Sequence, residues 1–123
     1  QPKARQAACR RVRRAVATEP FMVAGSGRFD TLVMEKTGEK ALIKTGAEGV
    51  YCASFPELGL GAAVKIDDGA GRAAEIAMGR LLRHLDILSE DEAAALGGVL
   101  SATVRNRAGL AVGEVRPAAQ IPF

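Results

Sequence analysis

Apolar residues recur at helical spacing near the start of the chain and predict a helix over residues 3–18, stopped before Pro20. Its apolar stripe is formed by Ala8, Val12, Ala15 and Val16. A glycine-bearing loop from Phe21 follows and leads into a short helix through about Lys36. Gly38 stands where a left-handed residue closes such a helix.

Three apolar segments come next, and their lengths and turn signals predict strands near residues 40–46, 49–55 and 60–66. Glycine turns and Pro56 separate them. Short connections of this kind join antiparallel neighbours, so the three segments predict an antiparallel sheet.

The pattern then returns to the helical period and predicts a long helix over residues 70–88. Its apolar stripe is formed by Ile76, Ala77, Leu81, Leu85 and Leu88. Ser89 and Glu92 have the spacing of a capping box and predict another short helix ending near Gly97. Extended segments at 102–104 and 110–112 follow, joined by a turn at 106–109. The fold class is therefore α/β (α+β), with an antiparallel sheet covered by helices.

Positive charge is concentrated at the start of this 123-residue chain, where six of the 17 lysines and arginines lie within the first 14 residues. One interpretation is an arm that binds the phosphates of nucleic acid. The other is a solvated helix face around an apolar stripe that packs, and we favour it because the arginines lie on faces that a packed helix leaves to water.

Composition narrows the choice of function further. Aromatic residues are only 4% of the chain, so stacking platforms for single-stranded nucleic acid are nearly absent. No apolar run is long enough to predict a membrane span, and no signal-peptide pattern is present, which favours a cytoplasmic protein. Cys9 and Cys52 lie on unrelated elements and lack ligand spacing, so we expect free buried thiols and no metal site in this chain.

Lys44 is the residue that most strongly suggests chemistry, because it ends an apolar strand and is followed by Thr45 and Gly46. Lys-Thr-Gly on a strand recurs in serine acyl-transferases, where the ammonium lines the cleft opposite a serine. An amine held among apolar residues loses hydration, which lowers its pKa and suits it to accept a proton. Thr45 offers a hydrogen bond and Gly46 leaves room beside the strand. The alternative is a structural lysine whose head reaches solvent at the sheet edge.

Two further features carry weaker signals. In Gly25-Ser26-Gly27-Arg28 the glycines permit close backbone approach, and the guanidinium of Arg28 suits a carboxylate. An ordinary loop explains the same pattern. His84 lies in the middle of a predicted helix, and we interpret it as a half-exposed helix residue rather than a member of a catalytic triad.

Several longer motifs together resemble the C-terminal part of the asparaginase II family, the rhizobial-type L-asparaginases. The motifs are residues 23–31 (Val-Ala-Gly-Ser-Gly-Arg-Phe-Asp-Thr), residues 43–51 (Ile-Lys-Thr-Gly-Ala-Glu-Gly-Val-Tyr), and residues 61–73 with their Asp-Asp-Gly and Arg-Ala. The resemblance implies the C-terminal half of a fold like that of the serine β-lactamases and glutaminases. It also implies hydrolysis of L-asparagine to L-aspartate and ammonia.

The resemblance assigns catalysis to Lys44, paired with a serine, and we add Thr45, Gly46 and Arg28 as substrate-binding candidates. No Ser-x-x-Lys motif, which supplies the family's other serine-lysine pair, occurs in these 123 residues. The family's zinc site is likewise upstream, and Cys9 and Cys52 do not match it. We therefore expect no cofactor bound by this chain, a zinc ion in a missing N-terminal portion, and no turnover by the chain alone.

Residues 1–123 are accordingly interpreted as a single domain or as the C-terminal fragment of a longer catalytic chain, with a basic helix over 1–20 and a helix-covered sheet over 21–123. The complete enzyme would be a cytoplasmic homodimer that binds neither nucleic acid nor membrane. Two alternatives stay open: a nucleic-acid-binding module built on the basic helix, and a β-lactam-recognising or glutaminase-like acyl transferase.

Overall fold

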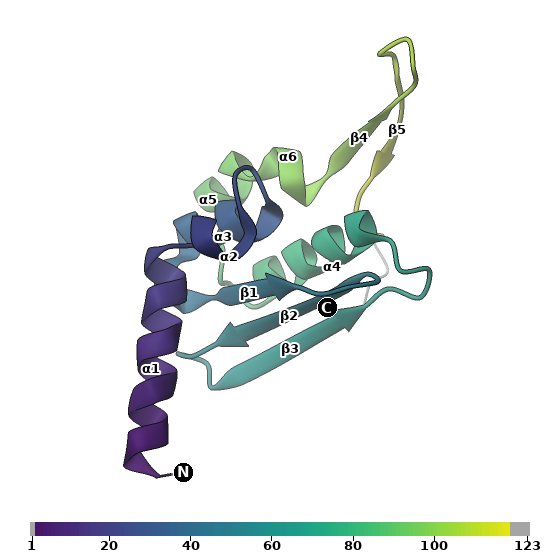
Figure 1. Ribbon diagram of the computed structural model, residues 1–123. Helices are drawn as coiled ribbons and strands as arrows, with labels where there is room; N and C mark the ends of the chain where they lie inside the picture. The colour runs from purple at the N-terminus through teal and green to yellow at the C-terminus, as the bar shows by residue number, and fades with distance from the viewer. Residues whose placement is uncertain (1, 119–123) are drawn as a thin grey trace. The chain divides into compact units, whose positions relative to one another are not determined.

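The basic N-terminal segment is helical, as its spacing predicts. The computed structural model describes residues 2–118, so the predicted boundaries at 1 and 123 lie outside the described residues. Helix α1 covers Lys3–Thr18 and ends just before Pro20 (Figure 1). None of its residues is buried, and Val12 is 63% exposed. The helix was therefore predicted correctly, but no residue of its apolar stripe is fully buried, and Val16 is half-buried.

Two short helices follow where one was expected. Helix α2 takes up Phe21–Ala24, at the start of the predicted loop, and α3 spans Phe29–Thr37. Gly38 ends α3 with φ 55° and ψ −128°. The positive φ was predicted, but this ψ is not left-handed helical, and the chain continues into a 3₁₀ turn, η1, at Gly38–Lys40.

The predicted antiparallel sheet is confirmed, and with the helices it establishes the α/β class. Its strand order is β1-β2-β3, with β1 at Leu42–Thr45, β2 at Val50–Phe55 and β3 at Leu60–Lys65. Side chains alternate between buried and accessible along β2, where Tyr51, Ala53 and Phe55 are buried. This period of two places Cys52 on the exposed side.

Helix α4, Gly71–His84, is shorter than predicted, and its buried face matches the predicted stripe only in part, since Ile76 is buried as expected. Ala74, Met78 and Leu82 are fully buried, whereas Leu81 is only half-buried. Asp86 ends the helix in a left-handed conformation, with φ 53°, and the Ile87 N–H donates to the Leu82 carbonyl at 2.9 Å. This is a Schellman closure with aspartate in the usual glycine position, which is why the apolar pattern through residue 88 overestimated the helix.

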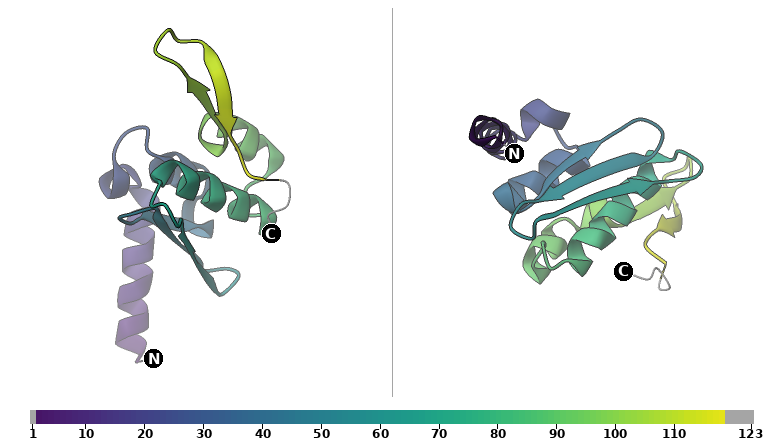
Figure 2. Two further views of the ribbon diagram at one scale, coloured as in Figure 1. Left: turned by 90° about the vertical axis from the view of Figure 1, so that its right-hand side faces the viewer. Right: turned by 90° about the horizontal axis from the view of Figure 1, so that it is seen from below.

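The C-terminal elements follow the sequence closely. The capping box is present, since Ser89 accepts from the Glu92 N–H and Glu92 accepts from the Ser89 N–H, and it starts α5, Glu90–Ala95. A further helical turn, α6, covers Gly97–Leu100. Strands β4, Ala102–Arg105, and β5, Ala111–Val115, form an antiparallel hairpin (Figure 2).

The described chain divides into two compact units, each with buried apolar residues of its own. The first unit consists of residues 2–44 and 52–62, and the second of residues 45–51 and 63–118. Buried apolar side chains of the first are Phe29, Val33, Met34, Ala41, Ile43, Ala53 and Phe55. Those of the second are Tyr51, Ala74, Ile76, Met78, Leu82, Ile87, Leu88, Ala93 and Leu96.

Candidate active site

Lys44 lies in β1, where the alternation of the strand decides its surroundings. Ile43 is 1% exposed, and the next side chain, Lys44, is exposed on the opposite side of the strand. The expected loss of hydration is therefore not found among the described residues. An accessible ammonium is nevertheless suited to meet a substrate or a second catalytic group.

Thr45 and Gly46 follow Lys44 into a tight turn. The Thr45 hydroxyl donates to the Gly46 carbonyl at 3.3 Å, and the Gly46 N–H donates to the Val50 carbonyl at 2.8 Å. A methyl group added at Gly46 would lie 3.1 Å from Val50 Cβ. The expectation that Gly46 leaves room beside the strand is thus corrected, because the Val50 side chain takes up that space.

Two turns of the second unit, at residues 46–49 and 67–69, pack against each other. The Gly49 carbonyl accepts from the Ile66 N–H at 3.0 Å. A methyl group on Gly49 would come within 2.8 Å of the Gly69 carbonyl carbon, so only glycine allows the two backbones to approach this closely. The turn at Asp67–Gly69 is itself fixed by a bond from the Ala70 N–H to Asp68 Oδ1 at 2.8 Å. The turn after β1 and the turn after β3 are therefore in close backbone contact, although they are separated in the sequence.

Lys65 is the residue of this region that sequence reasoning missed. Its ammonium donates to the Glu48 carbonyl at 2.8 Å and to the Ile66 carbonyl at 2.6 Å. Glu48 has a positive φ of 55°, so the side chain of Lys65 holds a strained residue of the turn after Lys44. No local pattern marks this contact, because the bonded residues lie 17 positions apart.

Arg28 directly precedes α3, in the same unit as Lys44, and its side chain is exposed. The glycines of its loop have φ of 93° at Gly25 and 66° at Gly27, and an added methyl group would meet nothing within 4 Å at either position. The Thr31 hydroxyl donates to the Gly25 carbonyl at 2.7 Å and fixes the loop against the helix. The loop is thus defined and open to solvent, as an anion cradle needs to be.

Asp30 follows Arg28 by two residues and is fully buried, with 0% exposure. It lies in the first turn of α3, where a carboxylate is favoured by the helix dipole. No buried side-chain nitrogen or oxygen within residues 2–118 lacks a hydrogen-bond partner, so Asp30 is a satisfied internal carboxylate.

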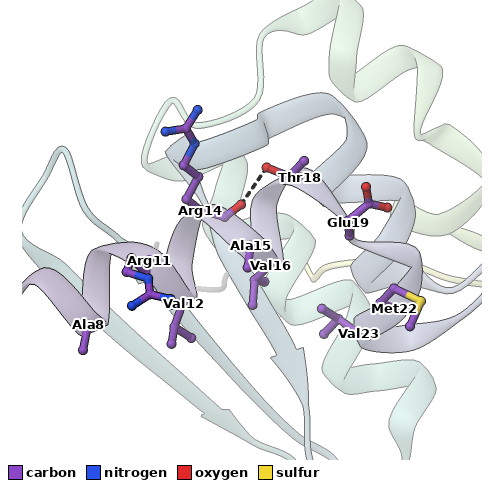
Figure 3. Close-up of a pocket in the computed structure, with 10 residues that line it drawn as sticks. All are labelled: Ala8, Arg11, Val12, Arg14, Ala15, Val16, Thr18, Glu19, Met22 and Val23. Carbon is purple, nitrogen blue, oxygen red and sulfur yellow. Dashed lines mark hydrogen bonds between the residues drawn. The ribbon is translucent and has the colours of Figure 1, made fainter.

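A separate apolar groove lies along α1 and α2 (Figure 3). Val12, Val16 and Val23 gather on one side of the segment, while the Arg14 side chain points away from them. The Thr18 hydroxyl donates to the Arg14 carbonyl at 2.8 Å. The residues that line the groove include neither a serine nor a histidine.

The two cysteines match the prediction in their oxidation state but not in their burial. Cys9 and Cys52 are free, as predicted, but both are exposed rather than buried. Residues 2–118 contain no group of three or more histidine, cysteine, aspartate or glutamate side chains that could hold a metal ion. His84 is the last residue of α4 and is exposed. The zinc ion expected in a missing N-terminal portion stays a prediction.

Fold and site together define an α/β protein in which an accessible lysine is the penultimate residue of a strand and begins a Lys-Thr-Gly sequence, a pattern that recurs on a strand in serine acyl-transferases. The chain belongs to the L-asparaginase II family, whose sequence model matches residues 1–117. None of the curated proteins matches the chain. Membership of the family indicates an asparaginase-type hydrolase with asparagine as its substrate.

None of the helices within residues 2–118 is long and apolar enough to span a bilayer.

Proposed function

We propose that the chain supplies the active-site lysine of an L-asparaginase that works by a serine-lysine mechanism. A serine outside these residues attacks the side-chain amide carbon of L-asparagine. Lys44 accepts the serine proton or stabilises the developing alkoxide with its charge. The C–N bond of the resulting tetrahedral intermediate then breaks, so that the nitrogen takes up the proton and leaves as ammonia while an aspartyl ester of the serine remains. Water hydrolyses this ester, which releases L-aspartate and restores the serine. The observation that carries this proposal is the exposed Lys44 near the end of β1, where only Thr45 separates it from the braced turn.

Thr45 and Arg28 are assigned to the substrate in the same proposal. The Thr45 hydroxyl donates to the Gly46 carbonyl at 3.3 Å, and a hydroxyl group can both donate and accept, so we assign it to hydrogen bonding with the substrate or with Lys44. Gly46 keeps the turn narrow beside them. The exposed guanidinium of Arg28 suits the α-carboxylate of asparagine.

The complete enzyme, in this proposal, contains an N-terminal portion with the nucleophilic serine and a zinc site, has a fold like that of the serine β-lactamases, and acts as a cytoplasmic homodimer. Residues 1–123 by themselves bind no cofactor and do not turn over asparagine. Family membership supports this function over the nucleic-acid-binding module.

Trapping with hydroxylamine tests the covalent intermediate in the full-length protein. An aspartyl ester is open to any small nucleophile, so asparagine with hydroxylamine is expected to give aspartyl hydroxamate alongside aspartate. The hydroxamate is measured by its iron complex or by mass spectrometry, with a reaction lacking enzyme as control. If aspartate forms at the normal rate and no hydroxamate appears at any hydroxylamine concentration, the ester is not on the pathway.

Substitution of Arg28 tests its role in binding. Arg28→Gln removes a charge-assisted hydrogen bond and is expected to raise KM for asparagine by about 10- to 100-fold while kcat changes less. Steady-state kinetics give both constants. Arg107→Gln, in the exposed turn between β4 and β5, is the matched control and should leave KM unchanged. An unchanged KM in Arg28→Gln would assign the carboxylate to another residue.

A further inference from the structure

The ammonium of Lys65 joins two backbone segments that meet beside the candidate site. It lies at the end of β3 and donates to the carbonyls of Glu48 and Ile66 at 2.8 Å and 2.6 Å. The Ile66 carbonyl also accepts from the Gly69 N–H at 3.0 Å. One side chain therefore ties the turn that follows Lys44 to the turn that follows β3.

The first of these turns has a strained backbone. Glu48 has φ 55° and Gly49 has φ 70°, and only glycine adopts such values without steric cost. A hydrogen bond to the Glu48 carbonyl favours the conformation that glutamate otherwise avoids. Besides this bond, the turn is held by the bonds from Gly46 N–H to the Val50 carbonyl and from Ile66 N–H to the Gly49 carbonyl.

The geometry of this turn matters for catalysis because Lys44 is joined to it directly through Thr45 and Gly46. A lysine side chain has four rotatable bonds, so its amine is well placed only if its backbone is fixed. Both atoms that accept a hydrogen bond from the Lys65 ammonium are backbone carbonyl oxygens. Lys65 therefore acts on the turn and not on the reacting atoms.

We infer that Lys65 is a positioning residue for the asparaginase reaction, which clamps residues 46–49 and thereby fixes Thr45, Gly46 and the adjoining Lys44. This inference rests on the proposed function of Lys44. Lysine suits the role because its ammonium donates in three directions from one atom, whereas the planar fork of arginine cannot reproduce the same pair of bonds.

The test compares Lys65→Met with the wild type in the full-length protein, by steady-state kinetics and by amide hydrogen exchange. We expect kcat to fall by about 10- to 100-fold with a smaller change in KM, as for a catalytic group displaced by about 1 Å. Exchange at the Gly46 and Ile66 amides is expected to speed up. Lys65→Arg should restore part of kcat, and Lys36→Met, an exposed lysine of α3, should leave both readouts unchanged.

Two readouts separate this inference from the proposed function. Wild-type kcat in both Lys65→Met and Lys65→Gln, or unchanged exchange at Gly46 and Ile66, would overturn the clamp even if Lys44→Met is inactive. Near-normal activity of Lys44→Met would instead overturn the proposed catalytic role of Lys44. The rates of amide hydrogen exchange at Gly46 and Ile66 would still decide whether Lys65 holds the turn.

Discussion

Replacement of Lys44 by methionine in the full-length enzyme is expected to abolish most of the asparaginase activity without unfolding the protein. Proton transfer by a positioned side chain contributes about 10²- to 10⁴-fold to a reaction rate, so kcat should fall by at least two orders of magnitude. Methionine retains an unbranched apolar chain and removes only the amine. Because Lys44 is exposed, the substitution should leave circular dichroism and thermal unfolding nearly unchanged.

Ammonia release from L-asparagine measures this loss. Lys36→Met is the matched control, since it removes an exposed lysine from α3 by the same chemical change. Lys44→Arg adds a sharper criterion, because arginine keeps the positive charge but does not accept a proton at ordinary pH. Activity close to wild type in Lys44→Met would remove this residue from the mechanism. Activity in Lys44→Arg alone would show that charge, not proton transfer, is what the site needs.

Alanine at Gly49 is expected to have the largest effect on stability. Gly49 is buried with φ 70°, and an added methyl group would lie 2.8 Å from the Gly69 carbonyl carbon and 3.0 Å from Ile66 Cβ. The left-handed backbone costs a residue with a side chain about 1–2 kcal/mol, and forcing a methyl group into a packed contact costs about 1–3 kcal/mol. The free energy of unfolding should therefore fall by about 3 kcal/mol.

Gly59→Ala is the matched control for this prediction. Gly59 has a similar φ of 64°, but a methyl group there would meet nothing within 4 Å. Urea unfolding followed by circular dichroism gives both free energies, and their difference isolates the contact of Gly49 with the second turn. If the free energy of unfolding fell equally in the two variants, the turns could move apart at little cost. The close packing of residues 49 and 69 would then not contribute to stability.

Much of the fold could be predicted because its signals are local. The capping box at Ser89 and Glu92 was predicted from two residues and is present with both hydrogen bonds. The strands were placed within two residues of their observed ends, since alternation and turn glycines act over a few positions. The end of α4 was not predicted, because Asp86 adopts a conformation more typical of glycine.

The sequence suggested which residue types form the candidate site, but it did not predict their exposure or their contacts. The longer motifs indicated the family that residues 1–117 match, whereas the catalytic role that the Lys-Thr-Gly pattern suggested for Lys44 stays a prediction. The prediction that Lys44 is held among apolar residues was wrong, because an apolar stretch does not reveal which side of the strand faces inward. Lys65 was missed for a related reason: its bond to Glu48 depends on two turns meeting across 17 positions of sequence.

By itself, the sequence determined the class of fold, the order of its helices and strands, the family, and the residue type on which the proposed chemistry depends. Those properties follow from periodicity, turn residues and contiguous motifs, all of which act through neighbours along the chain. Only the tertiary structure decided that Lys44 is exposed, that Val50 takes up the space beside Gly46, and that Lys65 braces the turn. These features depend on which backbone atoms approach through space, and that is set by the packing of the whole chain and not by any local pattern.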